Sequence, residues 1–193
     1  MTAPDSTADA TGSSLHITRR NLPHWQRGGS TYFVTFRLRE SGGDVPGGTG
    51  FQPVLTPQER RTVKDCILHW HRTRWHVHAL TVMPDHVHIL AEPVERSEGQ
   101  WYPLSTILHS VKRHSARSIN RLRGRRGPLW QPESFDRIVR DEKEFDEKAS
   151  YILTNAVKSG LVTDGWLYDG FWCEGMQGMP SAGWKPAPPE RPP

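Results

Sequence analysis

The order of elements along this 193-residue chain predicts an α+β fold, a ferredoxin-like antiparallel sheet backed by helices. Two observations predict it. Strand-like and helix-like stretches follow one another as strand, helix, strand, strand, helix and strand, with an extra helix at the end. The connections within this series are short, so that neighbouring elements can pack together in one sheet.

Composition limits the class of protein. Apolar residues make up 35% of the chain and the mean hydropathy is −0.67, so we expect part of the length to be disordered. A net charge of +4 permits an anionic partner. The two cysteines, Cys66 and Cys173, lie far apart, which argues against a disulfide scaffold or a cysteine zinc site. Without a long apolar run or an apolar secretory segment, the sequence predicts a soluble, cytoplasmic protein.

The first half of the chain carries clear local signals. Alternation predicts a strand over 31–38, and the glycine-rich residues 41–54 predict a flexible loop. Thr56 as N-cap, followed by Pro57 and Glu59, predicts the start of a helix that ends near Thr73. Two strands then follow over 76–92, broken at Met83-Pro84-Asp85 because proline cannot donate to a strand ladder.

The second half repeats the pattern. Helical periodicity predicts a helix over 103–122, and alternation predicts a strand over 135–139. A capping box of Asp141 and Glu144 predicts a last helix that runs to Lys158. We therefore expect a disordered segment over 1–20, one folded domain over 21–166, and an irregular or disordered tail over 167–193.

His86 and His88 are candidate metal ligands. On a strand, two side chains two residues apart point the same way, so both imidazoles can reach one divalent cation. A half-exposed strand with polar residues on its wet face explains the same spacing. His76 and His78 have that spacing too, so the motif alone does not decide.

A one-signed run of charge covers the predicted helix over 103–122 and the residues after it. No acidic residue occurs between Gly99 and Pro132, whereas solvated helix faces usually carry both signs. The run favours phosphate binding over a merely solvated face. Its candidate nucleic-acid-binding residues are Lys112, Arg113, Arg117, Arg121, Arg123, Arg125 and Arg126.

Tyr151 is the candidate nucleophile. Helical geometry places it opposite the apolar arc of the last helix, and Asn155, one turn later, points the same way. An amphipathic tyrosine on the surface is the alternative. A cation held by His86 and His88, with Asn155 as an oxygen ligand, would polarise a phosphodiester that the Tyr151 hydroxyl could attack.

Three stretches together resemble the IS200-like single-tyrosine transposases, and most closely the REP-associated tyrosine transposases. They are residues 82–88, residues 129–137 and residues 151–162, which occur in the family's order and spacing. The likeness covers roughly 22–166. Where the family usually has proline, this chain has Ala156, which touches no catalytic atom.

The resemblance implies an HUH endonuclease domain that cuts single-stranded DNA beside short hairpins. It implies His86, His88 and Asn155 as the metal site, for Mg²⁺ or Mn²⁺, and Tyr151 as the nucleophile that takes the 5′ phosphate. The implied setting is a bacterial, nucleoid-associated protein that acts as a monomer or homodimer.

Two alternatives differ in class. The first is a catalytically idle hairpin-DNA-binding regulator on the same fold, which the intact set of candidate catalytic residues disfavours. The second is an RNA-binding sheet with the aromatic residues of 32–36 as its platform, although these do not match the usual ribonucleoprotein motif.

Overall fold

The computed structural model describes residues 7–8, 14–19, 23–39 and 54–175, and the parts before Arg27 by their backbone alone. The loop predicted over 41–54 lies outside the described residues except for Val54. So does the tail beyond Gly175. Within the described residues, no helix is both long and apolar enough to cross a membrane.

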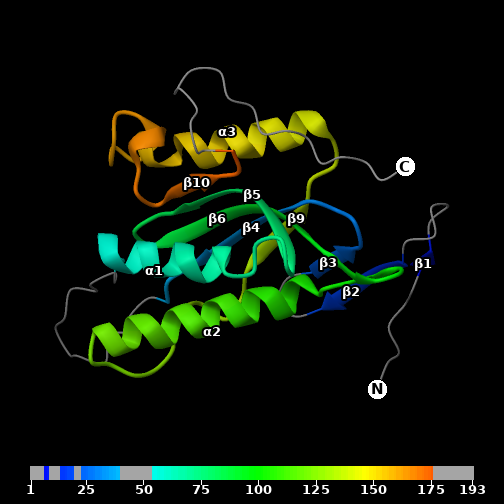
Figure 1. The fold of residues 1–193 in the computed structure, drawn as a ribbon, viewed down its shortest axis with the longest axis horizontal. Coiled ribbons are helices and arrows are strands. Elements are labelled where there is room, and N and C mark those ends of the chain that lie inside the picture. The colour runs from blue at the N-terminus through cyan, green and yellow to red at the C-terminus, as the bar shows by residue number, and fades with distance from the viewer. Residues whose placement is uncertain (1–6, 9–13, 20–22, 40–53, 176–193) are drawn as a thin grey trace.

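The fold is built on one five-stranded antiparallel sheet with the strand order β10-β5-β6-β4-β9 (Figure 1). Without β10, this is the order of a ferredoxin-like sheet, as the sequence predicted. Its strands are β4 (Tyr32–Arg37), β5 (Trp75–Val82), β6 (His86–Pro93), β9 (Phe135–Ile138) and β10 (Phe171–Cys173). Its helices are α1 (Pro57–Leu68), α2 (Leu104–Leu122) and α3 (Glu142–Lys158).

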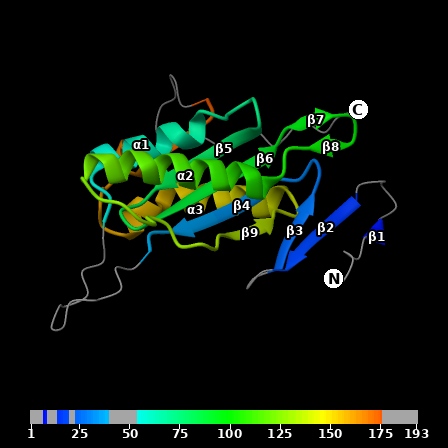
Figure 2. The same cartoon turned by 90° about the horizontal axis from the view of Figure 1, so that it is seen from below.

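The helices divide the core into two layers. α1 and α2 cover one face of the sheet and α3 covers the other, as Figures 1 and 2 show from two directions. β4 contributes to both layers because its side chains alternate: Tyr32 and Phe36 lie under α1 and α2, and Phe33 under α3. All three aromatic rings are buried, so the expected alternative of an exposed RNA-stacking platform is wrong.

The start of α1 is as predicted, whereas its end is not. The Thr56 hydroxyl accepts a hydrogen bond from the Glu59 amide, and the Glu59 carboxylate accepts one from the Thr56 amide. The helix ends at Leu68 rather than near Thr73. Arg72 has φ of 61°, a left-handed conformation that cannot continue an α-helix.

Several strands lie where none was predicted. β1 (Thr7–Ala8), β2 (Ser14–Arg19) and β3 (Pro23–Arg27) form a separate sheet, so the predicted disorder of 1–20 is wrong over the first two. β7 (Glu95–Ser97) and β8 (Gln100–Trp101) form a hairpin.

The short 3₁₀ helix η1 (Gly165–Leu167) and β10 lie at and beyond residue 166, where the sequence predicted an irregular or disordered tail to begin. β10 is only three residues long, too short for alternation to reveal. Its pairing with β5 orders it.

α3 is fixed at both of its ends. At the start, Asp141 accepts a hydrogen bond from the Glu144 amide, but Glu144 accepts from Arg140 rather than completing the predicted capping box. At the end, Gly160 with φ of 68° stops the helix. η1 then packs so closely on α3 that a Cβ added at Gly165 would lie 2.0 Å from the Leu153 carbonyl oxygen.

Gly165→Ala should therefore destabilise the protein. The added methyl group meets backbone and cannot be accommodated by a side-chain rotation, so we expect a loss of about 1–3 kcal/mol in the free energy of unfolding. Urea denaturation measures it. Thr163→Ala, at an exposed position nearby, is the control and should change stability by less than about 0.5 kcal/mol. Equal stability of the two variants would contradict the close packing.

Candidate active site and nucleic-acid interface

His86 and His88 lie on β6 just after the Pro84-Asp85 turn, where the sequence predicted them. The turn closes through a hydrogen bond from the Met83 amide to the His86 carbonyl, 2.8 Å long. β6 lies between β4 and β5 in the sheet, so His88 has a neighbour on each side: Thr35 on β4 and Thr81 on β5. The two imidazole rings lie together, with their centroids 4.7 Å apart.

Both imidazoles are oriented through their Nδ1 atoms. His86 Nδ1 lies 2.6 Å from an Asp85 carboxylate oxygen, and His88 Nδ1 lies 2.7 Å from the Thr35 hydroxyl. A carboxylate can only accept, so the His86 Nδ1 donates the proton of this hydrogen bond. Metal-bound histidines usually show this arrangement, in which the second ring nitrogen is held by a carboxylate or other acceptor.

His88 is neutral at ordinary pH. Burial, with smaller contributions from His86 and Arg37, lowers the pKa of its imidazole to about 3. Only 5% of the residue is exposed. A neutral imidazole has a lone pair to offer, which is the form that binds a cation.

Tyr151 reaches the same place from α3. Its hydroxyl oxygen lies 3.4 Å from His88 Nε2, and its ring meets the His88 ring edge-on, with centroids 5.0 Å apart. Phe33 supports both rings, stacked on His88 at 5.4 Å and edge-on to Tyr151 at 6.0 Å. Tyr151 is 38% exposed, so its hydroxyl stands between a buried imidazole and solvent. Lys158 places its ammonium group 5.7 Å from the centre of the tyrosine ring.

Asn155 differs from its predicted environment. It lies one turn after Tyr151 on α3 but is only 7% exposed, whereas helical geometry had placed it on the polar side. Its Oδ1 is buried and has no hydrogen-bond partner in the structure. Such an orphaned oxygen costs about 1–3 kcal/mol unless something binds it. The neutral imidazole of His88 and the unpartnered amide oxygen of Asn155 are both ligand types that divalent cations bind.

A second group of ligating side chains lies elsewhere. Among the described residues, His76, His78 and Glu174 form a group of three side chains that are close enough to share one metal ion. The chain can therefore offer a divalent metal more than one set of ligands.

The predicted basic residues divide into two kinds. Lys112 donates to the Pro132 and Glu133 carbonyls and the Ser134 hydroxyl, and burial lowers its pKa to about 8. Arg123 is paired with Glu59. These two side chains hold the fold together. The exposed ones are Arg113, Arg117, Arg121, Arg125 and Arg126.

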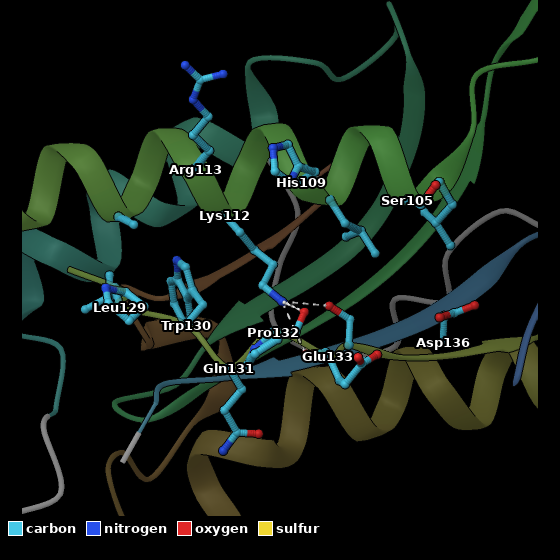
Figure 3. A pocket seen from close by; sticks show the side chains of 15 residues that line it. Ser105, His109, Lys112, Arg113, Leu129, Trp130, Gln131, Pro132, Glu133 and Asp136 are labelled. Carbon is cyan, nitrogen blue, oxygen red and sulfur yellow. Dashed lines mark hydrogen bonds between the residues drawn. The ribbon is translucent and has the colours of Figure 1, made fainter. Parts of the chain in front are cut away.

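A pocket of about 390 Å³ lies between α2 and residues 128–136. Lys112 reaches across it towards Pro132 and Glu133, whereas Arg113 points away from it (Figure 3). Trp130 forms part of the lining and donates a hydrogen bond from its indole to the Ser115 hydroxyl. The stretch 129–137, singled out in the sequence, therefore divides: residues 129–134 and Asp136 line this pocket beside the basic helix, whereas Phe135 pairs with Thr35 of β4 and Arg137 forms an ion pair with Glu144 of α3.

The basic helix and Tyr151 lie on opposite faces of the sheet, because α2 covers one face and α3 the other. The C-terminal end of α2 nevertheless lies near the turn that carries His86. Arg123 donates a hydrogen bond to the carbonyl of Val54. Leu55, which follows Val54, donates from its amide to the carbonyl of Pro84 in the turn. The exposed arginines at 121–126 and the histidine turn thus share one end of the sheet.

Sequence reasoning missed the residues that hold the histidines. Asp85 stands beside His86 in the motif, so its adjacency was a usable signal. Thr35 and Phe33 lie more than fifty residues before His88, and only strand pairing brings them there. No local pattern could have indicated them.

Comparisons with known proteins follow this geometry. No protein-family model matches the chain. It is 26% identical over 100 residues to a Haemophilus influenzae protein assigned as a REP-associated tyrosine transposase; the match covers 48% of this chain and only 57% of that protein. The solved structure of a REP-associated tyrosine transposase bound to a REP hairpin has the same fold, with a TM-score of 0.57, 23% identity, and coverage of 75% of this chain and 76% of that one. The resemblance seen in the sequence is thus confirmed: in sequence and in fold the chain is similar to REP-associated tyrosine transposases, consistent with the IS200-like single-tyrosine family.

Proposed function

We propose that this protein is a metal-dependent single-stranded DNA endonuclease and strand transferase that cuts beside hairpins through a 5′-phosphotyrosine intermediate. One observation carries the proposal. The Tyr151 hydroxyl lies 3.4 Å from Nε2 of a buried, neutral histidine whose Nδ1 is held by Thr35. A nucleophile beside an oriented, ligand-ready imidazole is what phosphodiester cleavage needs.

The chain's own residues perform the transfer as follows. Tyr151 Oη attacks phosphorus, and the bond from phosphorus to the 3′ oxygen breaks. The 3′ oxygen leaves as a hydroxyl once protonated, and the phenolic proton passes to solvent on the open side of the ring. The reverse attack, by a 3′ hydroxyl on the phosphotyrosine, joins strands and frees the tyrosine. The number of phosphodiester bonds is conserved, so no nucleotide cofactor is required.

His86, His88 and Asn155 are the residues proposed to hold the cation, Mg²⁺ or Mn²⁺. Its chemistry when bound is Lewis-acid polarisation of a non-bridging phosphate oxygen. Asp85 and Thr35 keep the two imidazoles in the orientation that leaves Nε2 available, and Phe33 supports the ring of His88.

The exposed arginines of α2 and the residues after it are proposed to bind the DNA backbone. Since Arg121, Arg125 and Arg126 share one end of the sheet with the His86 turn, a hairpin bound there can send its single strand around that end towards Tyr151. Tyr151 contacts His88 of its own chain, an arrangement that supports cutting by a monomer. The proposal includes the homodimer as the alternative assembly, and it places the protein at the nucleoid of a bacterial cell.

Tyr151→Phe should abolish the covalent protein–DNA adduct because only the attacking oxygen is removed. Hairpin-bearing single-stranded DNA from the flanks of the gene, incubated with Mg²⁺ or Mn²⁺, shows the adduct as a mobility shift in a denaturing gel. DNA affinity should change by less than about twofold. Tyr102→Phe is the matched control and should form the adduct normally. An adduct in the Tyr151→Phe variant would refute the assignment; hairpin binding without any adduct in the unaltered protein would favour the idle regulator.

Thr35→Val should weaken activation by the cation without changing the shape of the strand. It removes the hydroxyl that orients His88, and such outer partners typically contribute about 10–100-fold to metal affinity or activity. The dependence of cleavage on Mn²⁺ concentration measures it. Thr81→Val is the control, because Thr81 also flanks His88 across a strand pair, yet its hydroxyl donates to the Met83 sulfur. Equal effects of the two changes would contradict a role for the hydrogen bond.

Arg121→Ala combined with Arg125→Ala should make DNA binding less sensitive to salt. Each phosphate contact on a single strand contributes about −0.7 to the slope of log K against log salt, so losing two should flatten the slope by about 1.4. Arg96→Ala with Lys143→Ala removes the same charge from exposed sites away from α2 and should leave the slope within about 0.3 of its original value. An unchanged slope in the first variant would mean that these arginines are only solvated.

A further inference from the structure

The upstream histidine pair belongs to a cluster drawn from three segments of the chain. His76 and His78 lie on β5, and Glu174 follows β10 at the edge of the sheet. The ligand atoms of these three residues all lie within 4.8 Å of one another. His71, in the turn after α1, lies beside them, with its ring centroid 5.2 Å from that of His76.

Strand geometry assembles the cluster. The pairing of β5 with β6 shifts between Val77 and Ala79, so His78 is the extra residue of a bulge, a device that redirects a side chain. The two imidazole centroids are then 4.9 Å apart. The Glu174 amide donates to the His78 carbonyl over 2.9 Å, which fixes the carboxylate beside the pair. Phe145 of α3 packs edge-on against His78.

One ring nitrogen of the buried His78 lacks a hydrogen-bond partner. It is only 6% exposed, and its Nε2 has no hydrogen-bond partner. An unsatisfied buried nitrogen costs about 1–3 kcal/mol. Burial, with His76 nearby, lowers the pKa of His78 to about 4.

Neighbouring groups hold the Glu174 carboxylate in place through both of its oxygens. Arg72 donates to Glu174 Oε1 over 2.8 Å, while Oε2 contacts His76 Nε2. Burial alone would raise the pKa of Glu174, but hydrogen bonds from Arg72 and His76 hold it below its ordinary value. His71 Nδ1 accepts a hydrogen bond from the Val77 amide, so its Nε2 carries the proton and faces Glu174. His71 therefore acts as an orienting neighbour rather than as a ligand.

We propose that His76, His78 and Glu174 form a second metal site, which binds a transition-metal ion and for which Zn²⁺ is the best fit. Two imidazoles and one carboxylate are nitrogen-rich ligands that suit Zn²⁺, whereas Mg²⁺ prefers oxygen ligands. His78 and His76 lie three and five residues along β5 from Thr81, the neighbour of His88, which is roughly 10–16 Å at about 3.3 Å per residue. Its role is structural: an ion there links the edge strand β10 to β5.

This site is independent of the proposed DNA chemistry, and the experiment keeps the two apart. The full chain carrying His86→Ala and His88→Ala, which lacks the other histidine pair, is freed of metal with a chelator. It is then titrated with Zn²⁺ alone against a competing chromophoric chelator. We expect one tightly bound Zn²⁺ per chain. In the same background, Glu174→Gln should weaken that binding at least tenfold, because the amide has the same shape but no charge.

The matched control is Glu95→Gln, in an exposed hairpin, which should bind Zn²⁺ as the background does. If the metal-free Glu174→Gln variant does not melt cooperatively, and so is not folded, His76→Gln serves as the second test and should also weaken Zn²⁺ binding. Co²⁺ in place of Zn²⁺ should give visible absorption without a thiolate charge-transfer band, which excludes the cysteines as ligands. Absence of Zn²⁺ binding in the background variant, or equal affinity with Glu174 or His76 replaced, would overturn the proposal.

Discussion

The pairing of β6 with β4 and β5 is the constraint on which the rest of the structure depends. It turns His86 and His88 towards α3, and Val87 and Ile89 towards α1 and α2. A slip of one residue would exchange these faces and bury two imidazoles in the apolar layer. Because both faces of the strand are covered, such a slip would cost most of the core contacts of β6. The same packing that stabilises the sheet therefore also holds the candidate site in place.

Much of this could be predicted from sequence because the signals are local. A capping box opens α1, alternation marks β4, and a glycine ends α3; each acts within a few residues. Thr35 could not be found that way, since its meeting with His88 depends on which strands pair. Nor could β10, which gains its order from β5. The burial of Asn155 was missed because it depends on tertiary packing, which helical periodicity within α3 does not show.

The two His-x-His pairs show how little spacing alone decides. Both pairs lie on neighbouring strands, and both include one well-buried imidazole. They differ in what surrounds them. The downstream pair has a hydrogen-bond partner at each Nδ1 and a tyrosine hydroxyl beside it. The upstream pair has a bulge, a carboxylate from the sheet edge and an orphaned nitrogen. These partners come from other segments of the chain, and they give the two identical motifs different chemistry.

The path of α3 has a mechanical consequence. The helix starts after β9, at one edge of the sheet, and the chain returns through η1 to β10, at the other edge. α3 is thus connected at each end to an edge strand of the sheet, and Tyr151 lies between these two connections. Moving α3 as a whole away from the sheet would require unpairing an edge strand or bending the helix. In the proposed reaction, rearrangement on the protein side is therefore confined to the tyrosine side chain, and any larger movement falls to the DNA strands.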